Sequence, residues 1–118
     1  MENKSNTREK GEQLETIAND YLTKRGLALI TRNFQCKLGE IDLIMKDADT
    51  LVFVEVRYRR SDRFGRAAET VDRRKQRKLV RTALLFLKIH HLSQNTPCRF
   101  DIVGISPQPQ TDTLCFDW

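Results

Sequence analysis

The chain has 118 residues, of which 39% are hydrophobic, so it can bury one core but not two. Its formal net charge of +5 favours a polyanionic partner without identifying one. The three cysteines, Cys36, Cys98 and Cys115, are odd in number and widely separated, so they form neither a disulfide framework nor a zinc-ligand spacing. No segment has the apolar length of a signal peptide or a membrane span, so we expect a cytoplasmic protein with no membrane partner. The size of the chain predicts a single domain.

The chain opens with a polar segment followed by an amphipathic helix. Residues 1–9 show no apolar pattern and are expected to be flexible, which leaves 10–118 as the folded domain. Glu15 falls at the edge of the apolar stripe of the helix, where it can face inward. The stripe ends before a stop signal at Gly26 and consists of Leu14, Ile17, Ala18, Tyr21 and Leu22.

Three extended segments follow the first helix. The residues of 27–36 are rich in strand formers, a turn at 37–39 leads into a second strand, and a polar tip at 47–50 leads into a third. The run 51–56 is apolar on both faces except for Glu55, which is typical of a central strand covered on both sides. We therefore predict an antiparallel three-strand meander with helices packed on it.

A second helix and one or two further strands complete the predicted fold. Asp72 is a candidate N-cap for a helix that runs to about His91, and 98–105 and 113–118 are candidate strands. One arc of the helix is basic, whereas the opposite arc is apolar and can dock on the sheet. The order of elements predicts a single α/β domain with a mixed sheet.

The hairpin tip predicts a metal site. If 47–50 forms a tight turn, Asp42 lies directly opposite Glu55, with Cβ atoms ~4.5–5.5 Å apart on one face. Like charges this close need a cation, and Mg²⁺ (or Mn²⁺) commonly uses one or two carboxylates with water and substrate phosphate. The backbone carbonyl of Val56 can supply a further oxygen, and Arg57 points to the same face as Glu55, where it can hold a scissile phosphate.

These residues resemble those of known nucleases. Asp42 followed by Glu55-Val56-Arg57 is similar to the D…(D/E)xK signature of the restriction-endonuclease-like superfamily. The resemblance implies that fold, with Glu15, Asp42, Glu55 and Arg57 in the active site. More of the chain looks like the YraN family of proposed endonucleases, related in fold to archaeal Holliday junction resolvases: G(x3)E(x2)A at Gly11, Glu15 and Ala18, Asn33, GEIDLI at 39–44, FVEVR at 53–57 and FG(x3)E(x)V at 64–71.

Two consequences follow from this resemblance. Arg57 replaces the usual lysine of the superfamily signature, and because arginine does not deprotonate in proteins it cannot act as a general base. Another group must therefore take that role. By analogy with resolvases, whose substrates have two-fold symmetry, the chain is expected to form a homodimer.

The positive charge is concentrated between residues 57 and 81, which hold 11 Lys or Arg and only three acidic residues. Such a region can bind nucleic-acid phosphates, and DNA is the expected partner. Gln76 turns toward the sheet and borders the predicted site. The predicted nucleic-acid-binding residues are Arg59, Arg60, Arg63, Arg66, Arg74, Lys75, Gln76, Arg77, Lys78 and Arg81.

Other interpretations of the same residues stay open. Asp42 and Glu55 can be strand carboxylates that are each neutralised by a Lys or Arg, and Glu40 can form a cross-strand salt bridge with Arg57. Glu15 can be an ordinary exposed helix residue, and the basic stretch a solvated face.

These interpretations correspond to three classes of function. The leading prediction is a Mg²⁺-dependent endonuclease that hydrolyses phosphodiesters in structured or branched DNA. The alternatives are a catalytically inactive nucleic-acid-binding module of a repair or recombination assembly and a protein-interaction module with an acidic partner.

Overall fold

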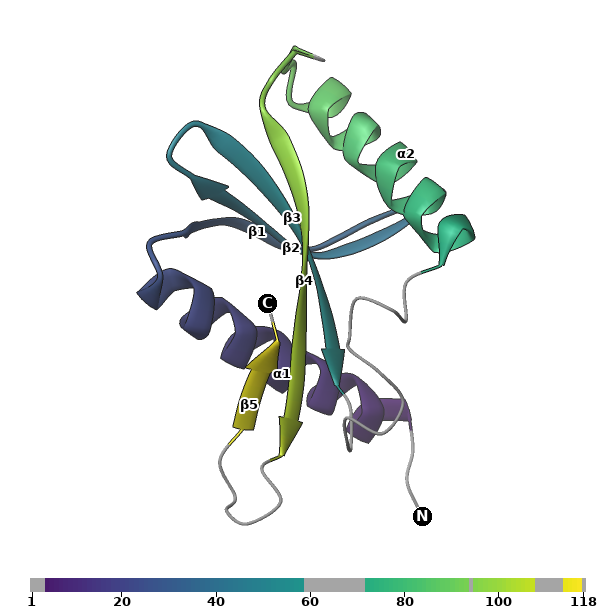
Figure 1. The fold of residues 1–118 in the computed structure, drawn as a ribbon. Helices are drawn as coiled ribbons and strands as arrows, with labels where there is room; N and C mark the ends of the chain where they lie inside the picture. The colour runs from purple at the N-terminus through teal and green to yellow at the C-terminus, as the bar shows by residue number, and fades with distance from the viewer. Residues whose placement is uncertain (1–3, 59–71, 94, 108–113, 118) are drawn as a thin grey trace.

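The fold was determined as a computed structural model that describes residues 4–58, 72–93, 95–107 and 114–117 (Figure 1). It contains two helices and five strands within these ranges. In chain order they are α1 (Lys4–Lys24), β1 (Ala28–Cys36), β2 (Gly39–Asp47), β3 (Thr50–Tyr58), α2 (Arg73–Ile89), β4 (Cys98–Pro107) and β5 (Leu114–Asp117).

The strands form one mixed sheet in the order β1-β2-β3-β4-β5. The first three strands are an antiparallel meander, β4 runs parallel to β3 after the crossover through α2, and β5 returns antiparallel to β4. The predicted α/β class, mixed sheet and meander are therefore confirmed. The arrangement is also consistent with a restriction-endonuclease-like fold.

The sheet is covered on both faces, as Figure 1 shows, with α1 on one side and α2 on the other. On the α1 side, Ala18 and Leu22 pack against Leu43 and Val54. On the α2 side, the core consists of Ile41, Ile44, Leu51, Phe53, Leu79, Ala83, Phe86 and Leu87. This double cover explains why residues 51–55 of β3 are all buried.

The ends of the helices agree with the sequence signals except at the N-terminus. Asp72 caps α2 by accepting the Lys75 amide at 2.9 Å, and α1 ends before Gly26, whose φ is +102°. However, α1 begins at Lys4, so it includes most of the segment 1–9 that was predicted to be flexible. Polar residues can continue a helix without an apolar stripe, and such an extension leaves no periodic signal.

The predicted hairpin register is confirmed. The tip closes with Asp47 paired to Thr50, and the pairing continues in step to Leu43 opposite Val54. This register places Asp42 and Glu55 at the next position of the two strands. Among the described residues, neither helix is long and apolar enough to cross a membrane.

Candidate active site

Asp42 lies where the ladder between β2 and β3 ends. The last paired residues are Leu43 and Val54, and beyond them the Asp42 carboxylate accepts the backbone amide of Val56 at 2.8 Å. The Asp42 side chain thus accepts a hydrogen bond that a backbone carbonyl of the neighbouring strand would accept in a regular antiparallel ladder. Asp42 is thereby directed toward the strand that carries Glu55.

Glu55 is buried, with 8% of its surface exposed, and it is neutralised by basic neighbours. Its Oε1 atom lies 3.0 Å from Lys75 Nζ on α2 and 3.6 Å from Arg57 Nε. The interpretation of a strand carboxylate with cationic partners therefore describes Glu55 correctly. Lys75, predicted only as a nucleic-acid-binding residue, belongs to the site itself.

Asp42 differs from Glu55 because no salt bridge to a Lys or Arg reaches it within the described part of the chain. Burial and the nearby charge of Glu55 raise the pKa of Asp42 to about 7, against the opposing effect of the Val56 amide; Glu15 and Glu40 add smaller increases. Four carboxylates therefore act on one another. Glu15 and Glu55 have cationic partners and Glu40 is exposed, whereas Asp42 is half-buried and pairs with no Lys or Arg among the described residues.

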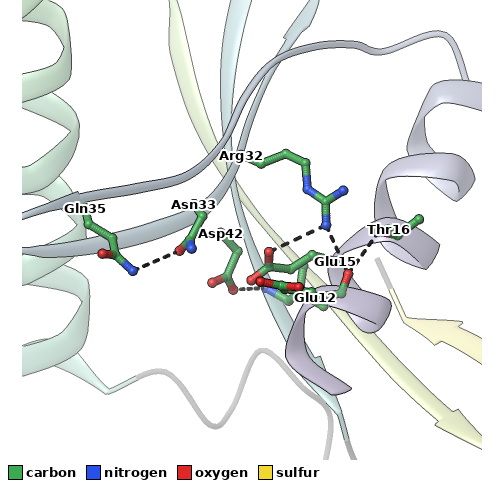
Figure 2. A network of polar contacts seen from close by, with 8 residues as sticks. Glu12, Glu15, Thr16, Arg32, Asn33, Gln35 and Asp42 are labelled. Carbon is green, nitrogen blue, oxygen red and sulfur yellow. Dashed lines mark hydrogen bonds and ion pairs between the residues drawn. The ribbon is translucent and has the colours of Figure 1, made fainter. Parts of the chain in front are cut away.

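Glu15 belongs to the same cluster, as the resemblance implied. It is half-buried on α1, and its Oε1 lies 3.8 Å from a terminal nitrogen of Arg32 on β1. The same Arg32 nitrogen donates to the carbonyl of Glu12 at 3.0 Å, as Figure 2 shows. Burial raises the pKa of Glu15, while Arg32 lowers it. The alternative of an ordinary exposed helix residue is wrong for Glu15.

Arg57 and Val56 complete the predicted set. The Nε atom of Arg57 is buried and, within the described part of the chain, makes no hydrogen bond, although it lies 3.6 Å from Glu55 Oε1. A buried guanidinium donor without a partner is costly, so this atom is available to an oxygen of an incoming ligand. Val56 gives its amide to Asp42 and packs its side chain on the α1 core, while metal binding by its carbonyl stays a prediction.

Glu40 does not form the salt bridge with Arg57 that the register allowed. Its Oε2 accepts a hydrogen bond from Gln35 Nε2 at 3.2 Å, whereas Arg57 lies against Glu55. The β2–β3 pairing ends at Leu43, so Glu40 and Arg57 do not face each other as ladder partners. That alternative was wrong for this reason.

The basic arc of α2 lies next to the site. Arg74, Arg77, Lys78 and Arg81 are exposed, as predicted. A cavity of about 540 Å³ joins this arc to Glu55 and is lined by Gly39, Glu40, Glu55, Asp72, Arg74, Lys75, Lys78 and Leu79. Gln76 lines a second, largely apolar cavity together with Glu55, so it borders the site as expected. Arg59, Arg60, Arg63 and Arg66 lie outside the described residues.

The donor set limits how a cation can be held. Within the described part of the chain, no group of three or more His, Cys, Asp or Glu side chains is arranged to hold a metal ion. A cation here would therefore be held by Asp42 and Glu55, with backbone oxygen and water in the other positions, as Mg²⁺ allows.

Comparison with known proteins gives the family. The model of the uncharacterised protein family UPF0102 matches residues 14–105. The chain belongs to the UPF0102 family. It is 50% identical to a UPF0102 protein of Nitrosococcus oceani over 107 residues, which cover 91% of this chain and 86% of the relative. It is 53% identical to one of Aliivibrio fischeri over 109 residues, covering 92% and 89%, and 43% identical to one of Alcanivorax borkumensis over 118 residues, covering 100% and 91%.

The match to UPF0102 includes every site residue described above, from Glu15 to Lys75. Sequence reasoning missed two residues of this cluster. Arg32 has no distinguishing signal, because a basic residue in a strand is most often exposed. Lys75 was recognised as basic, but only the docking of α2 on the sheet shows that it reaches Glu55.

Proposed function

We propose that the protein is a Mg²⁺-dependent endonuclease that hydrolyses phosphodiester bonds in structured or branched DNA. The observation that carries this proposal is Asp42, a largely buried carboxylate beside Glu55 that has no cationic partner among the described residues. The resemblance of the motifs around Asp42 and Glu55 to the YraN family and to the restriction-endonuclease-like superfamily supports the same function.

The site residues fit a divalent cation. Burial and mutual repulsion disfavour the ionised forms of these carboxylates, and a cation held by Asp42 and Glu55 would remove this penalty. Both groups offer oxygen ligands, which Mg²⁺ and Mn²⁺ prefer. When bound, such an ion polarises a phosphoryl oxygen and lowers the pKa of a bound water, which is the chemistry that phosphodiester hydrolysis requires.

The surrounding cations are placed to receive a phosphate. Arg57 offers a buried Nε donor that makes no hydrogen bond to any described residue, and Lys75 lines the cavity that leads to the basic arc. If Glu55 held a divalent cation, Arg57 and Lys75 would be free to donate to the oxygens of the scissile phosphate and to stabilise the charge that develops there. Glu15, which pairs with Arg32, would add negative charge beside such a cation.

A second candidate is supported by the ion pairs of Glu55. Lys75 and Arg57 already neutralise this carboxylate, and Arg57 cannot serve as a general base. A protein that has lost catalysis could keep this arrangement for stability and use the basic arc of α2 to bind nucleic acid. This candidate is the inactive DNA-binding module.

One experiment separates the two candidates. Labelled duplex, flap and four-way junction DNA are incubated with the wild type and with Asp42→Asn, in Mg²⁺ or Mn²⁺. Asp20→Asn, at an exposed position of α1, makes the same chemical change away from the site and serves as the control. Cleavage that falls at least about 100-fold in Asp42→Asn alone supports the endonuclease, because it removes a metal ligand.

Other outcomes of this experiment decide against the endonuclease. Binding of DNA without cleavage under either metal leaves the inactive module. Absence of binding to any nucleic acid at low salt excludes both candidates, because phosphate contacts are strongest under that condition.

A further inference from the structure

The pairing of β1 with β2 contains an irregularity that the register alone does not reveal. Arg32 pairs with Leu43, and Phe34 pairs with Ile41, so one residue of each strand lies between the two pairs. In a regular strand, residues two apart lie on the same face of the sheet. The two pairs should therefore share a face.

They lie instead on opposite faces. Arg32 contacts Glu15 on α1, and Leu43 belongs to the core beneath α1. Phe34 makes an edge contact with Phe86 on α2, and its partner Ile41 belongs to the α2 core. The alternation of side chains between the two faces therefore inverts in both strands between these two pairs, without any change of register. This inversion is a turnover of both strands.

The residues at this turnover are Asn33 and Asp42. Asn33 has φ +56°, and among the described strand residues it is the only non-glycine residue with a left-handed backbone inside a strand. A left-handed residue reverses the alternation of side chains, and asparagine tolerates this conformation better than other non-glycine residues. Asn33 thus explains the turnover locally.

The turnover gives Asp42 its direction. A residue in a regular strand points perpendicular to the sheet, toward one helix or the other. Asp42 points along the sheet instead, into the end of the β2–β3 ladder, where it accepts the Val56 amide at 2.8 Å. This direction leaves its carboxylate near both Glu15 on α1 and Glu55, which pairs with Lys75 on α2.

We propose that Asn33 is a positioning residue, whose left-handed backbone turns β1 and β2 over and so directs Asp42 into the site between Glu15 and Glu55. The inference rests on the proposed function in one respect: the placement of Asp42 would serve to present its carboxylate to a metal ion. The side chain of Asn33 is not required, since among the described residues its one hydrogen bond is accepted from the exposed Gln35, at 3.3 Å (Figure 2).

The test compares residues with different tolerance for a left-handed backbone. Asn33→Gly adopts this conformation freely, whereas Asn33→Val, with a β-branched side chain, strongly disfavours it. The first readout is hydrogen exchange of the Val56 amide, measured by NMR, with the Val52 amide of the same strand as reference. The second readout is the affinity for Mn²⁺ in the absence of DNA.

We expect Asn33→Val to lower the protection of the Val56 amide at least about tenfold while leaving that of Val52 unchanged, because only Val56 depends on Asp42. The same variant should weaken Mn²⁺ binding by about tenfold. Asn33→Gly should match the wild type in both readouts. Gln35→Ala, which removes the hydrogen bond to the Asn33 side chain, should also match it. Should Asn33→Val fail to fold, Asn33→Ala replaces it, with the same effects expected in smaller size.

Two results overturn the inference. Val56 protection that survives in Asn33→Val or Asn33→Ala shows that the backbone of Asn33 does not direct Asp42. Loss of protection in Asn33→Gly shows that the side chain, and not the backbone, is responsible. The exchange experiment needs neither metal nor DNA, so it decides this question even if the protein proves to have no nuclease activity.

Discussion

The replacement of Asp42 by asparagine should stabilise the metal-free protein at alkaline pH. The two side chains have the same shape, and the amide oxygen of asparagine can still accept the Val56 amide. The substitution removes a charge that burial and Glu55 disfavour. A loss of function would therefore accompany a gain in stability, which is the opposite of the usual effect of a substitution near a core.

The size of the effect follows from the pKa of Asp42. The difference between 3.8 for an unperturbed carboxyl and about 7 in the folded protein corresponds to ~4 kcal/mol, at 1.36 kcal/mol for each pKa unit. Asparagine makes a weaker hydrogen bond to Val56 than a carboxylate does, and this loss offsets part of the gain. We expect Asp42→Asn to be about 2 kcal/mol more stable than the wild type near pH 8.

The pH dependence of this difference has a definite sign. Between about pH 4 and pH 7, the folded wild type keeps the Asp42 proton and the unfolded chain releases it, so the stability of the wild type falls as the pH rises. Asp42→Asn lacks this dependence. The advantage of the variant should therefore be largest above about pH 7 and should shrink to below about 1 kcal/mol near pH 4.5.

Urea unfolding in the presence of EDTA measures both quantities, with Asp20→Asn as the control at an exposed position. Addition of Mg²⁺ near pH 8 should then stabilise the wild type but not Asp42→Asn, because only the wild type offers the carboxylate. The reasoning is refuted if Asp42→Asn is less stable than the wild type at alkaline pH, or if the difference between them does not change with pH.

Three further predictions concern α2 and its contact with the hairpin. Gly39→Ala should destabilise the protein by ~1–3 kcal/mol in thermal or urea unfolding, because a Cβ atom would lie 3.1 Å from Thr82 Oγ1 at a φ of +155°; unchanged stability would contradict this. Lys75→Met should tighten Mg²⁺ binding in calorimetry, because Lys75 Nζ pairs with Glu55 Oε1 at 3.0 Å and so competes with a cation for that oxygen. Weaker binding would show that Lys75 assists metal binding instead. Arg74→Glu combined with Arg81→Glu should weaken DNA binding independently of sequence and flatten its salt dependence, and an unchanged slope of affinity against salt would exclude both residues from phosphate contact.

Much of the fold was predictable because its signals are local. The Asp72 cap, the stop at Gly26 and the tight turn at 47–50 each depend on residues close in sequence, and each lies where it was predicted. The two-sided apolar run of β3 identified the central strand, since only a strand covered on both faces has that composition. The start of α1 was missed because a polar helical extension has no apolar periodicity.

The sequence predicted which side chains lie close together in the candidate site, but not their geometry. The hairpin register correctly brought Asp42 and Glu55 to the same level of adjacent strands. Strict alternation, however, would have placed both carboxylates on one face, and the turnover of β1 and β2 at Asn33 directs Asp42 along the sheet instead. A single left-handed asparagine has no reliable signature in one sequence. The ion pair of Glu55 with Lys75 was also hidden, because it depends on how α2 docks.

The charges around the site explain why a metal and a phosphate could bind together. Lys75 and Arg57 neutralise Glu55, and Arg32 partly neutralises Glu15, whereas Asp42 has a pKa near neutrality and no cationic partner within the described residues. A divalent cation would supply the missing positive charge and at the same time release the cations from Glu55. The released cations would then have to find new anionic partners, and a scissile phosphate beside the metal offers its oxygens at that point. Metal binding and substrate binding should therefore strengthen each other, because each removes a charge imbalance that the other creates.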